Sequence, residues 1–147
     1  MGKVLIVYYS LSGNTKQAAE AVAEGASRTP DTEVEIKDAL KAGPADLLAC
    51  DAIGVGTPDY FSYMAGGLKD FFDRSFYPTQ GQVVGKPCGV FVTHGGGGKA
   101  VESVKSLCTA FKFEVVADPV LVQNAPDAKA KKALAALGRT LATMAQK

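Results

Sequence analysis

An unbroken apolar run, followed by a short polar loop and an alanine-rich stretch, constrains the fold of this chain more than any other feature. Val4 to Tyr9 carries no charged residue, which predicts a strand buried on both faces. The stretch from Thr15 to Ser27 repeats small apolar residues along one stripe, which predicts a helix that packs closely on a sheet. A buried strand joined to a helix by a few residues is the building unit of a parallel α/β fold.

The same alternation continues to the end of the chain. Further strands are predicted at 33–37, 51–56, 87–93 and 114–122, the last interrupted by Asp118 and Pro119, and further helices at 45–49, 68–76, 99–111 and beyond Asp127. Charges alternate with Val34 and Ile36, so 33–37 is expected at a sheet edge. Thr57 and Pro58 are expected to end the third strand. The pattern predicts one domain, residues 1–147, with a five-stranded parallel sheet in a three-layer α/β sandwich.

The first loop has the composition of an anion site. Backbone N–H groups at the start of a helix favour an anion such as phosphate, and hydroxyls and amides can add hydrogen bonds. The loop contains no lysine and lacks both common nucleotide-loop motifs, which points to a terminal monophosphate held by neutral donors. The alternative is that Ser12 or Asn14 simply caps the helix. The residues of this loop are Ser10, Leu11, Ser12, Gly13, Asn14 and Thr15.

Two later loops are expected at the same carboxyl edge of the sheet, where ligands bind in open α/β folds. In the loop that follows Thr57, Tyr60 and Phe61 can stack on a flat heteroaromatic ring or pack against the core. In the other, His94 precedes four glycines, which mark a close approach of the backbone to a ligand or a flexible loop. His94 is the only histidine, so it is a candidate functional group or a hydrogen-bonding residue, and it makes no metal site by itself.

Charge and cysteine content narrow the functional classes. The formal net charge of +1 argues against a nucleic-acid or polybasic membrane surface. Three cysteines, Cys50, Cys88 and Cys108, are odd in number and far apart, so they fit neither a disulfide framework nor a zinc site. The sequence shows no secretion signal and no apolar run long enough to span a bilayer, so we expect a cytoplasmic location.

Two motifs resemble a known family. The first loop resembles the phosphate loop of flavodoxin-like FMN-binding proteins. The segment 56–60 together with 64–74 is similar to the second loop and helix of the tryptophan-repressor-binding-protein type of NAD(P)H:quinone oxidoreductase. The resemblance covers essentially the whole chain in element order and implies a sheet order of 2-1-3-4-5.

The resemblance also implies a cofactor, FMN, and the residues that hold it. Ser10, Leu11, Ser12, Gly13, Asn14 and Thr15 would hold the FMN phosphate. Thr57, Pro58, Asp59, Tyr60 and Phe61 would flank the isoalloxazine, and Thr93, His94, Gly95, Gly96 and Gly97 would lie on its other edge.

This sequence departs from the family at three points that bear on function. It is near neutral where carrier flavodoxins are acidic, its third loop has His94 and glycines in place of a stacking tyrosine, and it lacks the inserted segment of the quinone reductases. Two functions follow as alternatives: an FMN electron carrier between redox partner proteins, or an NAD(P)H-dependent reductase of quinones or flavins with His94 as a proton donor. A phosphorylated receiver domain is disfavoured, because no acidic cluster follows the first strand.

Overall fold

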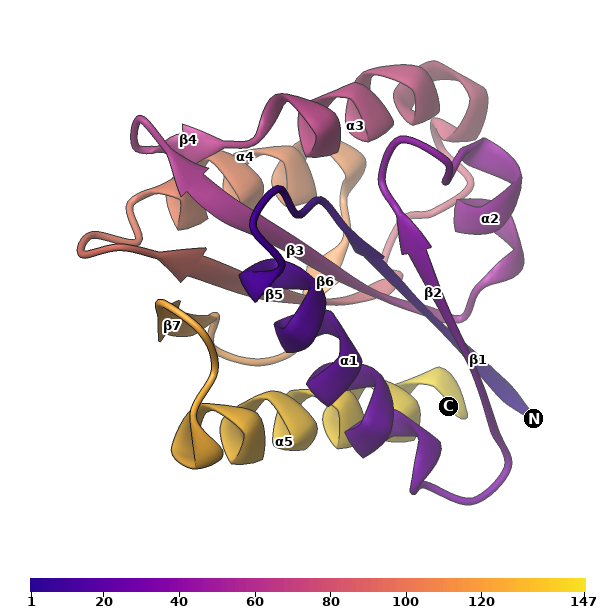
Figure 1. Cartoon of the computed structure of the whole chain (residues 1–147). Coiled ribbons are helices and arrows are strands. Elements are labelled where there is room, and N and C mark those ends of the chain that lie inside the picture. Colours follow the sequence, from indigo (N-terminus) through magenta and orange to yellow (C-terminus); the bar gives the residue numbers. More distant parts are fainter.

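A computed structural model describes all residues, Met1 to Lys147 (Figure 1). The strands are β1 (Gly2–Tyr8), β2 (Thr32–Asp38), β3 (Ala52–Tyr60), β4 (Tyr63–Met64), β5 (Pro87–His94), β6 (Glu114–Val115) and β7 (Val120–Gln123). The helices are α1 (Asn14–Ser27), α2 (Pro44–Ala49), α3 (Gly66–Thr79), α4 (Ala100–Phe111) and α5 (Ala128–Ala145). None of these helices combines the length and the apolar character needed to cross a bilayer.

The sheet has the predicted order. β1 pairs in parallel with β2 and β3, and β5 pairs in parallel with β3. Both β6 and β7 pair in parallel with β5, at its beginning and at its end, so they form the interrupted fifth strand that the sequence predicts around Asp118 and Pro119. Counted as five parallel strands, the order 2-1-3-4-5 and the α/β class are confirmed, and 32–38 lies at an edge as expected.

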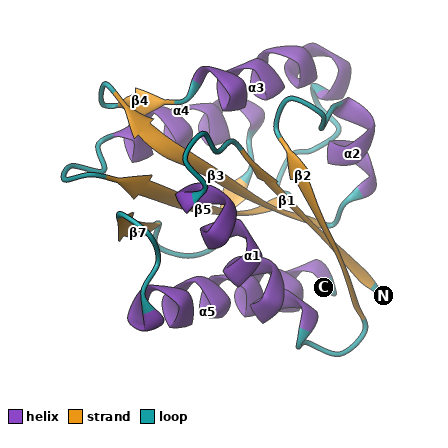
Figure 2. Ribbon diagram, in the orientation of Figure 1, coloured by secondary structure: helices purple, strands orange, loops and turns teal.

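The prediction that Thr57 and Pro58 end the third strand is wrong. β3 runs on to Tyr60 and turns back into β4, with which it forms an antiparallel hairpin (Figure 2). β1 stays beside β3 only as far as Gly56, whereas β5 pairs with β3 as far as Pro58. Beyond Gly56 one side of β3 is therefore open, and a proline fits there because a missing ladder hydrogen bond matters little at an open edge.

Helices cover both faces of the sheet, and alternate strand residues supply the two cores. Leu5 and Val7 join the core beneath α2, α3 and α4. Val4 and Ile6 join the core beneath α1 and α5. All four side chains are fully buried. Because successive strand residues point to opposite faces, the continuous apolar run of β1 is what a sheet covered on both faces requires.

The three cysteines are free and lie in the core beneath α2, α3 and α4. Burial raises the pKa of the Cys50 thiol from its usual 9.0 to about 11, with the charge of Lys86 opposing the shift. The thiolate is thus disfavoured in the folded protein, whereas the same thiol has its usual pKa in the unfolded chain.

We expect the free energy of unfolding to fall as the pH rises from about 9 to about 11, with Cys50 contributing on the order of 2 kcal/mol to the loss. Urea unfolding of the wild-type protein and of Cys50→Ala at about pH 8.5 and about pH 10.5 measures this contribution. The variant should lose less stability between the two pH values than the wild type, and equal losses would contradict the prediction.

Candidate functional site

The loops that follow β1, β3 and β5 meet at the carboxyl edge of the sheet around an open cleft of about 460 Å³. The hairpin of β3 and β4, the loop after β5 and the start of α1 lie at the same side of the molecule (Figure 1). The lining residues are Ser12, Asn14, Pro58, Asp59, Tyr60, Thr93, His94, Gly95 and Asn124. Parallel strands explain the convergence, because their carboxyl ends all reach one edge.

Helix α1 begins at the cleft without a cap from any side chain. Its N-cap residue is Gly13, with φ 103°, and the Ser10 Oγ accepts the Gly13 N–H at 3.0 Å. The alternative that Ser12 or Asn14 caps this helix is therefore wrong. The backbone N–H groups of the first turn have no acceptor in the protein before Gln17, whose N–H donates to the Gly13 carbonyl. They are free to bind an anion at the positive end of the helix.

Two buried hydroxyls join the start of α1 to the end of β5. Thr15 and Thr93 are almost completely buried, and their Oγ1 atoms lie 2.7 Å apart in a hydrogen bond. One hydroxyl proton is used in this bond, so the pair retains one proton for a ligand. The bond also fixes the loop after β1 relative to the loop after β5.

The hairpin is fixed by two side chains that sequence reasoning assigned to a ligand. Asp59 Oδ1 accepts the Ser62 N–H at 2.9 Å, and Asp59 Oδ2 accepts the Ala100 N–H at 3.2 Å at the start of α4. Thr57 is fully buried, and its Oγ1 accepts the Ala65 N–H at 2.9 Å at the start of α3. Asp59 thus links the hairpin tip to α4, and Thr57 links β3 to α3.

Replacing Asp59 with Asn should loosen this link. The amide keeps one acceptor oxygen but places its NH₂ group against a backbone N–H, so we expect a loss of about 1–2 kcal/mol in the free energy of unfolding. Amide hydrogen exchange at Ser62 and Ala100 should accelerate together. Asp70→Asn is the matched control: Asp70 pairs with Arg74 on an exposed face of α3, so it should change stability by less than about 0.5 kcal/mol. A loss in Asp59→Asn no larger than in this control would refute the linking role.

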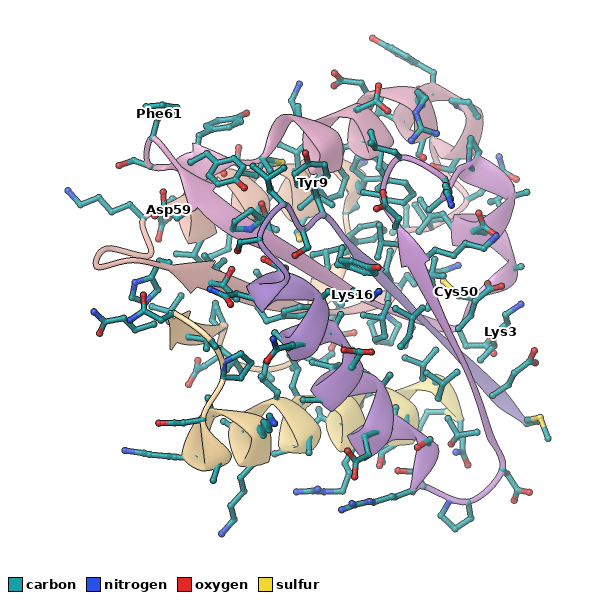
Figure 3. The ribbon with its side chains drawn as sticks, viewed as in Figure 1. Lys3, Tyr9, Lys16, Cys50, Asp59 and Phe61 are labelled. Atoms are coloured by element: carbon teal, nitrogen blue, oxygen red, sulfur yellow. The ribbon has the colours of Figure 1, made fainter.

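The two aromatic residues of the hairpin have different positions. Tyr60 is partly buried and lines the cleft, and partial burial raises the pKa of its phenol, with a smaller effect from Tyr9. Phe61 stands at the hairpin tip, completely exposed, with φ 58° (Figure 3). The alternative that Phe61 packs against the core is therefore wrong.

The loop after β5 has specific contacts. His94 Nδ1 accepts the Gly97 N–H at 3.1 Å, so the hydrogen of the neutral ring belongs on Nε2. The Asn124 N–H donates to the His94 carbonyl at 2.8 Å, and Gln123 Nε2 donates to the Gly95 carbonyl at 3.3 Å. These bonds fasten the loop to the end of β7, which disfavours the flexible-loop interpretation.

The structure thus divides the predicted site residues into two groups. Eight of them line the cleft. The others lie outside its wall: Ser10, Leu11, Gly13, Thr15, Thr57, Phe61, Gly96 and Gly97.

Sequence reasoning missed Asn124, which reaches the cleft because β7 runs beside β5. The sequence feature that could have identified Asn124 is its position as a polar residue between the last strand and the last helix. The other site loops were identified by the same feature.

Comparisons with known proteins agree with this geometry. Residues 28–127 match the family described as NADPH-dependent FMN reductase. A flavodoxin of Aquifex aeolicus (strain VF5) is 37% identical over 115 residues, which are 77% of this chain and 62% of that relative, so the match spans less than two thirds of the relative's length.

Two solved structures share the fold over nearly their whole length. A flavodoxin from the domain Archaea superposes with a TM-score of 0.89 at 26% identity, covering 99% of both chains. A flavodoxin, WrbA-like protein from Agrobacterium tumefaciens superposes with a TM-score of 0.84 at 26% identity, covering 99% of this chain and 98% of that one. The matched residues, the sheet order and the position of the cleft together show that this chain belongs to the flavodoxin-like FMN-binding proteins, within the family of NADPH-dependent FMN reductases.

Proposed function

We propose that this chain, acting as one domain over residues 1–147, binds FMN in the cleft and carries electrons between redox partner proteins. The uncapped first turn of α1 is the observation that supports the proposal most strongly. It offers free N–H groups next to neutral polar side chains, with Ser12 and Asn14 on the cleft wall. That donor set suits a phosphate bound without a metal ion.

The other walls of the cleft suit a flat ring. Pro58, Asp59 and Tyr60 form one side, and Thr93, His94 and Gly95 form another. An aromatic side chain and exposed backbone groups are what a planar heterocycle with polar edges needs. When bound, FMN supplies the electron-accepting and electron-donating chemistry, and the protein tunes it through hydrogen bonds and local polarity.

In this proposal the remaining predicted residues act indirectly. Ser10 and Gly13 shape the phosphate loop, Thr15 supports it through Thr93, and Thr57 holds the hairpin. Leu11, Phe61, Gly96 and Gly97 would frame the opening of the cleft. Three free, buried thiols agree with a reducing compartment such as the cytoplasm.

Titration of the purified protein with FMN and with riboflavin tests the proposal. We expect FMN to bind at least about tenfold more tightly than riboflavin, because only FMN offers the phosphate to the start of α1. Absorbance and quenching of flavin fluorescence measure both affinities. No binding of FMN, or equal affinity for riboflavin, would overturn the proposal.

A second candidate function, an NADPH-dependent reductase of flavins or quinones, is favoured by the family match over residues 28–127. The two functions differ in one measurement. A reductase consumes NADPH when the FMN-loaded protein is given only a quinone or free flavin, whereas a carrier needs a partner protein to be reduced. Sustained turnover of NADPH would therefore favour the reductase over the carrier.

A further inference from the structure

Helix α5 concentrates positive charge on one face of the molecule. It carries Lys129, Lys131, Lys132 and Arg139 and no acidic residue. The whole chain has a formal net charge of only +1, so the rest of the molecule is net acidic. All four side chains are exposed, and none takes part in an ion pair. Such an asymmetry orients an approaching charged molecule.

The three lysines lie in the first turns of α5, which begins on the same side of the molecule as the cleft. They fall within the first five residues of α5, a few residues after Asn124 on the cleft wall. Figure 1 shows the start of α5 close to β7, on the side of the molecule that carries the hairpin and the loop after β5. The carboxylate of Asp127, which precedes the lysines, accepts the Ala130 N–H at 2.8 Å as the helix cap.

Local stability does not account for the lysines at this position. Cations near a helix N-terminus interact unfavourably with the helix dipole. The first turn of α5 contains no acidic residue, and only the Asp127 carboxylate at the N-cap offsets the effect. The helix dipole therefore does not favour lysines at this position.

An apolar strip accompanies the lysines. A groove of about 600 Å³ runs between β7 and the start of α5, lined by Val120, Leu121, Val122, Gln123, Asp127, Lys129, Ala130 and Ala133. Leu121 is half exposed, and β7 lies at the edge of the sheet. The positive charge continues along a second groove between α1 and α5, where Lys131, Lys132 and Arg139 face the paired Arg28 and Glu24.

We propose that the surface formed by Leu121, Lys129, Lys131 and Lys132, here called the α5 docking face, binds an acidic redox protein and presents it to the cleft. The proposal rests on the proposed electron-transfer function. Lysines would attract and orient the partner's carboxylates, and Leu121 would supply a short-range apolar contact. The half-exposed Leu121 on the edge strand β7 favours a protein partner, because protein interfaces combine a central apolar contact with charged residues around it.

Two soluble probes of opposite charge test the docking face: an acidic plant-type [2Fe–2S] ferredoxin and a basic haem protein, cytochrome c. Titration calorimetry with oxidised ferredoxin measures association, and stopped-flow absorbance measures electron transfer from reduced ferredoxin to the FMN-loaded protein. The association constant and the rate constant of electron transfer should each fall by about tenfold as the salt concentration rises from about 20 to about 300 mM. The rate of electron transfer from the reduced, FMN-loaded protein to oxidised cytochrome c should not fall with salt.

Variants identify the surface. We expect two quantities to fall by about tenfold at low salt in the triple variant Lys129→Gln/Lys131→Gln/Lys132→Gln: the association constant for ferredoxin and the rate of electron transfer from it. The affinity for FMN should stay unchanged. The control Lys41→Gln/Lys105→Gln/Lys112→Gln makes the same charge change at other exposed, unpaired lysines and should change association less than about twofold. Leu121→Ser should weaken association without changing its salt dependence.

Three results would overturn the docking face: equal losses in the two triple variants, stronger association with cytochrome c than with ferredoxin, or tighter binding to polyuridine RNA or to anionic phosphatidylserine vesicles than to ferredoxin. The docking face and the cofactor proposal fail separately. A protein that binds no FMN refutes the proposed function, but calorimetry with oxidised ferredoxin still tests whether the lysines of α5 bind an acidic protein.

Discussion

Gly138→Ala is expected to lower the free energy of unfolding by about 3 kcal/mol, a large loss for the addition of a single methyl group. A Cβ at Gly138 would overlap the Val22 carbonyl oxygen of α1 and press on the backbone nitrogen of Ala26. Backbone atoms cannot rotate away as a side chain can, so α1 and α5 would have to separate. The higher helix propensity of alanine, about 1 kcal/mol, offsets only part of this loss.

The contact is reciprocal, so a second variant tests the same packing. A Cβ at Gly25 of α1 would overlap the Ala135 carbonyl oxygen of α5, and Gly25→Ala should be destabilising by a similar amount. Urea unfolding followed by circular dichroism measures both variants, and the transition temperature should fall by about 10 °C. The control is Gly66→Ala, at the start of α3, where a Cβ meets open space. A loss in Gly138→Ala as small as that in the control would mean that the helices do not cross in backbone contact.

Asn14→Asp is expected to weaken FMN binding on the order of 100-fold, about 3 kcal/mol, while stabilising the FMN-free protein by about 0.5 kcal/mol. Asn14 is the first residue of α1 and lines the cleft. A carboxylate there favours the positive end of the helix but repels a phosphate bound to the same N–H groups. The opposite signs are the signature of a phosphate site, because a purely structural defect would lower both quantities.

Flavin titration gives the affinity, and unfolding of the FMN-free protein gives the stability. Gln17→Glu adds the same charge one turn into α1, on an exposed side chain that does not line the cleft, so it should weaken FMN binding by less than about fivefold. If Asn14→Asp binds FMN as tightly as wild type, the phosphate does not lie at the start of α1.

Local patterns in the sequence predicted most of the architecture. Val4 to Tyr9 predicted a doubly covered strand because two-sided burial leaves a continuous apolar run. The Asp118-Pro119 break predicted the division of the last strand into β6 and β7. The three loops that follow β1, β3 and β5 were predicted to lie at one edge, and they do meet around the cleft. Each of these inferences depends on residues close together in the chain.

The individual side chains were harder to assign. Asp59 was expected at a flavin ring, yet its two oxygens hold N–H groups of Ser62 and Ala100. Phe61 was given two alternatives, and its exposure leaves no contact with the core. Asn124 was overlooked because its place in the cleft depends on β7 lying beside β5.

The sequence by itself determined the strand–loop–helix order, the apolar faces and the edge at which the loops gather, because hydrophobic period and turn chemistry are properties of neighbouring residues. Only the tertiary structure decided that β3 extends into a hairpin, that α1 begins uncapped, and that α1 and α5 touch at Gly25 and Gly138. These features depend on pairs of residues that are distant in the chain, and whether such groups meet is set by how the layers pack.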